Sequence, residues 1–213
     1  MRPAFRNALW VLAVCVIPVS AGLSLTSPLL QWRSGIYIAA GFAGVVAMCL
    51  LAVQPLLAAG YLPGLSRYRM RRVHGIVGAL LIAAIAVHVG GLWLTSPPDV
   101  VDALTFSSPT PFSDWGVIAM WAALAAALLV ALRRRLGMQR RVWRPVHAAL
   151  AGLTVGASAA HAMLIDGTME SISKAALCAL AVVVTVAAFA DLGVWRRGSQ
   201  RGANVQDESQ KTG

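Results

Sequence analysis

The sequence predicts an all-α integral membrane protein built as a bundle of six transmembrane helices. Its 213 residues are 58% hydrophobic and only 12% charged, with a mean hydropathy of +0.71. A soluble domain carries about twice that charged fraction. In addition, six apolar segments are long enough to cross a bilayer. They are 8–26, 35–60, 73–95, 114–133, 145–165 and 172–195.

The first segment follows Arg2 and Arg6 and has two interpretations. It is either the first membrane helix or the apolar part of a signal peptide, with a cleavage site at Val19-Ser20-Ala21. Cleavage would leave five helices and would not change the topology of the others.

The remaining segments are separated by polar turns. The second and third flank an arginine-rich turn that ends at Arg72, and the fourth and fifth flank another that ends at Arg144. Pro145 is a favourable first residue for the fifth helix, because the first turn does not need its N–H. The sixth segment ends before a polar tail, 198–213, which we expect to be a disordered cytoplasmic tail.

The arginines predict the orientation. They precede the first segment, lie in the two turns just described and follow the sixth segment, which places them on one side of the membrane. Arg33 and Lys174 alone fall on the other side. The positive-inside rule then makes both termini cytoplasmic. The net charge of +10 is thus explained without nucleic acid. The acidic residues of the outer side are Asp99, Asp102, Asp114, Asp166 and Glu170.

All four histidines lie in two apolar segments as matched pairs. His74 and His88 are fourteen residues apart in the third segment, and His147 and His161 are fourteen apart in the fifth. On a helix this spacing gives about 21 Å of rise and about 40° of rotation. Each helix therefore presents two histidines on nearly one face. Because the two helices run in parallel, His74 is expected to face His147 at the inner edge, and His88 to face His161 at the outer edge.

Paired imidazoles at two depths predict two haem b centres, and at least one. Neutral imidazole binds iron through one nitrogen, while the other donates to a group that fixes the ring. Two axial histidines leave no open position, which favours electron transfer over oxygen binding. Zinc is disfavoured because no carboxylate or thiolate lies at ligand spacing. The expected metal ligands are His74, His147, His88 and His161.

Other residues fit the same prediction. Arg72 and Arg144 stand two or three residues before the inner histidines, and guanidinium groups bind carboxylates well, so we expect them to hold haem propionates. A wide porphyrin also needs small side chains one turn inward from each ligand. The residues at those positions are Gly78, Ala84, Ala151 and Ala157.

The stretch from about Leu50 to Leu164 resembles the ferric reductase-like transmembrane family. The segments LLAVQPLL, RRVHGIVGALLIAAIAVH and LRRRLGMQRRVWRPVH are similar, in this order, to that family's second helix, its third helix and its arginine-rich link to the fifth. The family includes the membrane domains of NADPH oxidases and ferric reductases. It also includes the haem-binding subunit of the bacterial periplasmic methionine sulfoxide reductase system. The resemblance implies a domain over 1–197 that holds haem b between the third and fifth helices, in the bacterial inner (cytoplasmic) membrane.

Two departures from the family pattern bear on function. The sequence has no glycine-rich dinucleotide fingerprint after a strand, so it resembles the membrane-only branch and needs a separate protein to oxidise a nicotinamide. That branch generally lacks a histidine at the position of His74, whereas the full set of four resembles the di-haem branch.

Three functions follow from these observations. The first is a di-haem b membrane cytochrome, the electron-transfer subunit of an oxidoreductase. It would carry electrons from a cytoplasmic-side donor, either a flavoprotein with FMN or FAD or quinol, to a periplasmic acceptor. The second is the haem-binding membrane anchor of a periplasmic reductase that docks on the acidic outer loops. The third is a haem-free proton or metal transporter, with Gln54 and Thr154 as additional polar groups. Besides these partners we expect contact with membrane lipid.

Overall fold

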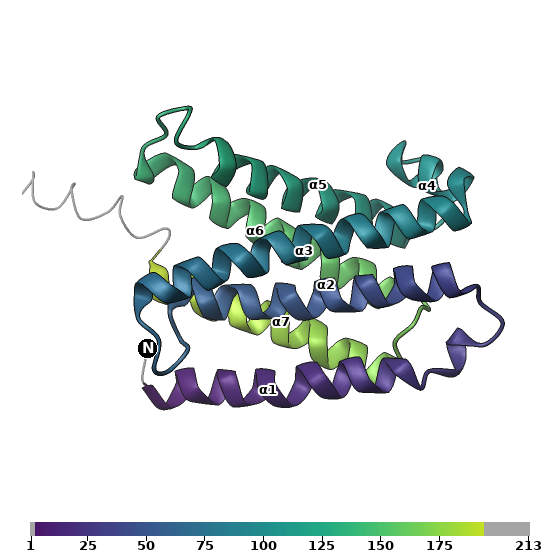
Figure 1. The fold of residues 1–213 in the computed structure, drawn as a ribbon, viewed down its shortest axis with the longest axis horizontal. Coiled ribbons are helices and arrows are strands. Elements are labelled where there is room, and N and C mark those ends of the chain that lie inside the picture. Colours follow the sequence, from purple (N-terminus) through teal and green to yellow (C-terminus); the bar gives the residue numbers. More distant parts are fainter. Residues whose placement is uncertain (1–2, 194–213) are drawn as a thin grey trace, which may run out of the picture.

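The computed structural model describes residues 3–193, and this part of the chain is entirely helical (Figure 1). Six of its helices are long and apolar enough to cross a membrane, which confirms the predicted class of integral membrane protein. The helices are α1 (Pro3–Leu25), the short 3₁₀ helix η1 (Pro28–Leu30), α2 (Gly35–Ala59), α3 (Arg67–Thr95), α4 (Pro97–Leu104), α5 (Pro111–Leu132), α6 (Arg140–Leu164) and α7 (Ser171–Leu192).

Three helices begin earlier than the hydropathy indicates. α1, α3 and α6 start at Pro3, Arg67 and Arg140, five or six residues before the apolar segments at 8, 73 and 145. Arginine is a good helix former, so each helix continues into its basic flank. Pro145 therefore lies in the second turn of α6, and its prediction as the first residue is wrong. The polar tail 198–213 lies outside the described residues.

The short helix α4 was not predicted. It connects α3 to α5 at the end of the bundle opposite the arginine-rich turns (Figure 1). Two prolines start it, and Asp99 in its first turn interacts favourably with the helix dipole. Val100 is buried, whereas Asp99 and Asp102 are exposed. Asp99 and Asp102 interrupt the apolar residues of this eight-residue helix, so it contains no long apolar run for a hydropathy search to find.

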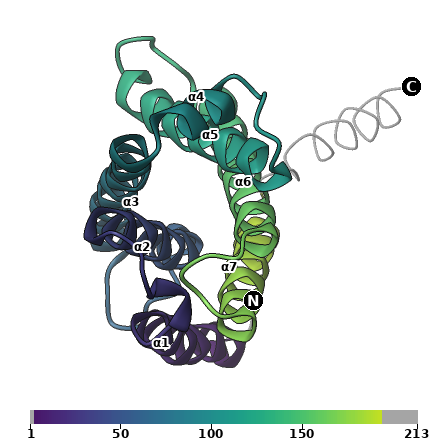
Figure 2. The same cartoon turned by 90° about the vertical axis from the view of Figure 1, so that its right-hand side faces the viewer.

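The spanning helices form a ring in the order α1, α2, α3, α5, α6, α7 (Figure 2). Their closest packing is within two antiparallel hairpins, α2 on α3 and α5 on α6. α7 closes the ring by packing on α1, α2 and α6, and the main apolar core lies on that side, around Leu56, Leu177 and Val184. In contrast, α3 and α6 are not packed closely on each other. Apolar side chains on the outside of the ring, such as Leu80 and Leu128, are exposed and suited to contact with lipid.

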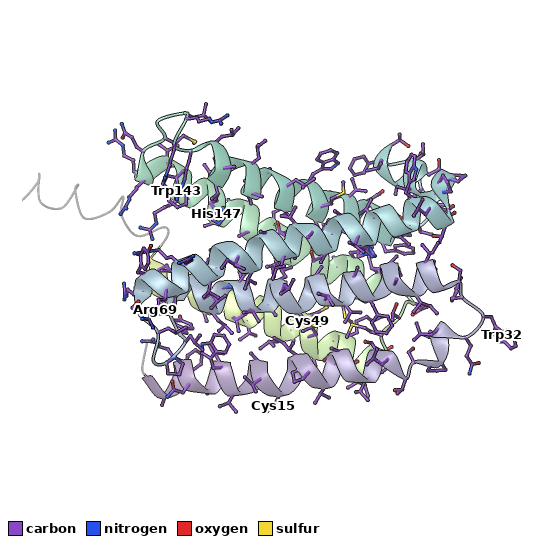
Figure 3. The ribbon with its side chains drawn as sticks, in the orientation of Figure 1. Cys15, Trp32, Cys49, Arg69, Trp143 and His147 are labelled. Carbon is purple, nitrogen blue, oxygen red and sulfur yellow. The ribbon has the colours of Figure 1, made fainter. Side chains whose placement is uncertain are left out.

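Charge separates the two ends of the bundle. We call the end that holds the turns before α3 and α6 the arginine-rich end; Arg69 and Trp143 lie there, and Trp32 lies at the opposite end (Figure 3). The arginines at this end lie in the first two turns of α3 and α6 and in the turn after α5; they are Arg67, Arg69, Arg71, Arg72, Arg133, Arg134, Arg135, Arg140, Arg141 and Arg144. The opposite end holds α4 with its two aspartates.

At the arginine-rich end, a small polar cluster joins α1, α2 and α7. Arg6 Nη2 of α1 donates to the carbonyl of Gly60, 2.7 Å away, and its guanidinium lies over the ring of Tyr61. The Tyr61 hydroxyl donates to the Ala187 carbonyl of α7 at 3.3 Å. Burial and the neighbouring Asp191 carboxylate raise the pKa of Tyr61 to about 12. The phenol therefore stays protonated and remains a donor at physiological pH.

We expect Tyr61→Phe to lower the free energy of unfolding by about 1 kcal/mol, because it removes one buried hydrogen bond. Thermal unfolding in detergent measures the change. The matched control is Tyr68→Phe on α3, where the ring is 70% exposed and the change should be close to zero. Equal effects of the two substitutions would contradict the role given to the Tyr61 hydroxyl.

Candidate functional site

The four histidines meet as two pairs across the gap between α3 and α6. The ring centroids of His74 and His147 are 6.4 Å apart, with an interplanar angle of 82°. Those of His88 and His161 are 6.5 Å apart, at 78°. All four side chains are half-buried. The fourteen-residue spacing predicted these two pairs. The third and fifth apolar segments of the sequence are α3 and α6 of the structure.

The separation within each pair fits one metal ion bound by both rings. A metal lies about 2.0 Å from an imidazole nitrogen, and that nitrogen lies about 1.1 Å from the ring centroid, so two opposed ligands have centroids about 6.2 Å apart. Both observed distances are close to this value. Within residues 3–193, no three His, Cys, Asp or Glu side chains converge on a metal position. Each pair could offer a metal two nitrogen ligands, and a metal held there would need its other ligands from a cofactor.

The outer pair, His88 and His161, is held by backbone carbonyls of neighbouring helices. His88 Nδ1 lies 2.8 Å from the Ala40 carbonyl of α2. His161 Nδ1 lies 2.7 Å from the Phe112 carbonyl of α5. A carbonyl can only accept, so each Nδ1 carries the proton and donates it. The lone pair of each ring is then on Nε2, which is the tautomer that a metal ligand requires.

Two glycines make room for these rings. Gly44 and Gly116 each stand four residues after the carbonyl that accepts the bond. A Cβ added to Gly44 would lie 3.0 Å from His88 Nδ1, and one added to Gly116 would lie 2.8 Å from His161 Nδ1. A side chain at either position would push the ring away. The sequence analysis missed both residues, although their matched place before the histidines was a visible signal.

The two hairpins repeat the same design. Ala40 and Phe112 are 72 residues apart (112 − 40), as are Gly44 and Gly116, and the outer histidines are 73 apart (161 − 88). The α2–α3 hairpin therefore holds His88 as the α5–α6 hairpin holds His161. The hairpins face each other through α3 and α6, with the four imidazoles between them.

The inner pair, His74 and His147, is held less tightly. His74 Nδ1 lies 3.3 Å from the Gln54 carbonyl of α2. The Gln54 side-chain amide also lies against this ring and, in its satisfied orientation, accepts from the N–H of Gly78 at 2.7 Å. Ala126 of α5 is the backbone group that interacts with His147, but the buried His147 Nδ1 has no partner at hydrogen-bond geometry. In the orientation of the Gln54 amide that accepts from Gly78, its nitrogen lies 2.5 Å from His74 Nδ1. The His74 ring is therefore held by the side chain and the carbonyl of Gln54 together, whereas His147 Nδ1 has no hydrogen-bond partner among the described residues.

The surroundings of His147 are aromatic and basic. The ring of Trp143 lies 6.2 Å from that of His147, and Arg133 lies over the Trp143 ring at 4.4 Å. Arg144 is half-buried and Arg72 is exposed, both at the arginine-rich end. Neither arginine has an ion-pair partner in the described part of the chain, so their guanidinium groups remain available for an anion.

A cavity of about 480 Å³ surrounds the outer pair. This size is within the range of about 300–1,000 Å³ that cofactor pockets have. Helices α2, α3, α5 and α6 form its walls, and α4 lines its outer part. Both His88 and His161 line it, together with Gly44 and Gly116.

The lining of the cavity differs from the prediction that small residues one turn inward from the outer histidines lie beside the cofactor. Its lining one and two turns inward from the ligands consists of Ile85 and Leu81 on α3 and Ser158 and Thr154 on α6. These positions are three and seven residues before each outer histidine. Ala84 and Ala157, four residues before, are not part of the lining, because successive helical positions are rotated by about 100°. At the inner pair, Gly78 packs on Gln54, since its Cβ would lie 3.0 Å from that amide.

No family model, curated protein or solved structure matches this chain. The likeness to the ferric reductase-like transmembrane family therefore rests on the three sequence motifs.

We expect Gly116→Ala to lower the free energy of unfolding by about 1–3 kcal/mol, because the new methyl group displaces the His161 ring and breaks a buried hydrogen bond. Gly156→Ala, on α6, is the matched control, since its added Cβ meets no atom within 4 Å. Alanine there should stabilise the helix by up to about 1 kcal/mol. Thermal unfolding in detergent compares the two, and a neutral Gly116→Ala would mean that the ring does not need this space.

Proposed function

We propose that the chain is a di-haem b membrane cytochrome of the ferric reductase-like kind. It carries electrons from a cytoplasmic-side donor, a separate flavoprotein or quinol, to an acceptor on the outer side. The main support is that two histidine pairs stand at two depths on α3 and α6, each at the separation that one shared metal requires.

The proposed orientation places the arginine-rich end in the cytoplasm of a bacterial cell, with both termini on that side. His74 and His147 then lie near the donor side, and His88 and His161 near the acceptor side. The two sites are fourteen residues apart on each helix, which corresponds to about 21 Å along the membrane normal. Two sites at these depths would divide the path of an electron across the apolar layer into shorter distances.

In this proposal the four histidines would hold the two haem irons through their Nε2 atoms. Haem, when bound, would supply reversible one-electron chemistry. The carbonyls of Ala40 and Phe112 keep the outer imidazoles in the ligand tautomer. The cavity around the outer pair provides space for a flat cofactor.

At the inner site, Arg144 and Arg72 are the proposed partners of haem carboxylates. Arg144 is half-buried and three residues from His147, which is less than one helical turn. Guanidinium groups without another ion-pair partner bind carboxylates with two parallel hydrogen bonds.

A second candidate is the haem-binding membrane anchor of a periplasmic reductase. The supporting observation is that Asp99 and Asp102 on α4 are exposed and also line the outer cavity. An acidic surface beside the outer site is suited to docking a partner with a basic face. The shorter histidine–carbonyl bonds of the outer pair also favour that site where a single haem is bound.

The first test is the visible spectrum of the purified chain, with haem counted per chain. We expect two low-spin haems b, and only one in His88→Ala or His161→Ala. His74→Ala and His147→Ala should each lose the other haem. Ser158→Ala, which alters the cavity lining without removing a ligand, is the control and should keep both.

Other outcomes separate the alternatives. One haem, lost in the outer variants alone, would favour the anchor subunit. Full haem content in His88→Ala and His161→Ala would overturn the outer assignment. A folded, active and colourless protein would overturn the cytochrome and favour the transporter.

A separate prediction concerns the inner carboxylate partner. Arg144→Met should increase the loss of the inner haem about tenfold or more, the effect of one charge-assisted hydrogen bond. Arg141→Met, an exposed arginine in the same turn region, should leave the loss rate unchanged. Transfer of haem from the detergent-purified protein to an excess of a haem scavenger measures both rates. Equal rates in the two variants would exclude a specific role for Arg144.

A further inference from the structure

We propose that Lys174 binds a carboxylate group of the haem in the outer cavity, an inference that rests on the proposed function. Lys174 lies in the first turn of α7 and lines the same cavity as His88 and His161. It is the one lysine or arginine in that lining. Its side chain is only 6% exposed, although lysine is rarely buried without a partner.

The position of the amine relative to the ligand is fixed by one bond. Lys174 Nζ donates to the Ile165 carbonyl at 2.7 Å. Ile165 ends α6 four residues after His161, which is about one helical turn. The ammonium group is therefore held about one turn beyond the outer ligand, toward the end of the bundle. Arg144 stands at a comparable distance beyond His147 at the arginine-rich end.

Among the described residues, the charge of Lys174 is balanced only at longer range, by Glu170, and by no direct ion pair. An ammonium group has three donors, and the Ile165 carbonyl accepts from one. Glu170 is the nearby acid, but its two oxygens accept from the N–H groups of Ile172 and Ser173, 2.8 and 2.7 Å away, and cap α7. No carboxylate in residues 3–193 lies within ion-pair distance of Nζ. A buried charge in this state is unfavourable unless an anion approaches it.

The cavity itself favours a carboxylate at this position. Asp99 and Asp102 line the part of the cavity formed by α4 and repel an anion there. Lys174 attracts one on the α7 side. A cofactor held by His88 and His161 fills the space between, so its own carboxylates are the anions closest to the amine. A free carboxylate from solution offers the same chemistry, and the experiment separates the two sources.

The experiment uses the full chain purified with its haem and measures haem transfer to an excess of scavenger. Lys174→Met should increase the loss of the outer haem about 10- to 100-fold, the effect of a hydrogen-bonded charge pair. The inner haem should be lost at the wild-type rate. Lys174→Arg keeps the charge and should restore slow loss. Arg33→Met removes the other cation of this end, which is not part of the cavity lining although it lies over the ring of Tyr37, and should have no effect.

Each remaining outcome has a defined meaning. Unchanged outer loss in Lys174→Met would overturn the proposal while leaving the cytochrome intact. Equally faster loss of both haems would indicate general unfolding and would also count against a specific contact. If added acetate slows haem loss in the wild type but not in Lys174→Met, the anion is a free carboxylate and the haem assignment is wrong. A chain that binds no haem would overturn the proposed function and this inference together.

Discussion

The arrangement of the candidate site depends on hydrogen bonds between histidines and the backbone of the next helix. The Ala40 and Phe112 carbonyls are already part of the helical hydrogen-bond ladder, and each can accept a second bond because a carbonyl has two lone pairs. Such an acceptor is inflexible, so it fixes the ring more firmly than a side chain could. It is also neutral, which matters in an apolar layer where an unpaired charge is costly. The close approach that these bonds need is possible because Gly44 and Gly116 have no side chain.

This way of holding the histidines explains the distribution of packing in the bundle. Each ring is positioned by its own hairpin, α3 by α2 and α6 by α5, so α3 and α6 need not pack on each other. The apolar core lies instead between α1, α2 and α7, where Leu56, Leu177 and Val184 are almost fully buried. The core and the candidate site adjoin each other, since Val45, Leu51 and Leu81 belong to the core cluster and also line the outer cavity. The bundle tolerates loose packing between α3 and α6 because α7 packs on α1, α2 and α6 and holds the two sides of the ring together.

The sequence predicted those features that side chains encode directly. Apolar length gave the six spans, and equal histidine spacing gave the two facing pairs. The acceptors of the histidine bonds could not be predicted, because a backbone carbonyl has the same chemistry in every residue. The rotation of each helix about its own axis also could not be predicted from the sequence. For this reason Ala84 and Ala157 were expected at the positions where Ile85 and Ser158 line the cavity. In the sequence, Lys174 was only a basic residue on the outer side, against the positive-inside rule. Its burial could not be predicted, because it depends on how α7 packs in the fold.

The repeated hairpin has a consequence for which changes in length the chain can accept. Ala40 and Gln54, whose carbonyls lie at hydrogen-bond distance from His88 and His74, are fourteen residues apart. Phe112, the acceptor for His161, is also fourteen residues from Ala126, the backbone neighbour of His147. Both intervals match the fourteen residues between the histidines of the adjacent helix. One residue inserted within any of these four stretches would rotate half of a helix by about 100° and break one pair. The turns differ, since 20 residues separate Gln54 from His74 (74 − 54) and 21 separate Ala126 from His147 (147 − 126). Evolution can therefore lengthen or shorten the turns of this protein, whereas the helical stretches between acceptors and between histidines must keep a constant length.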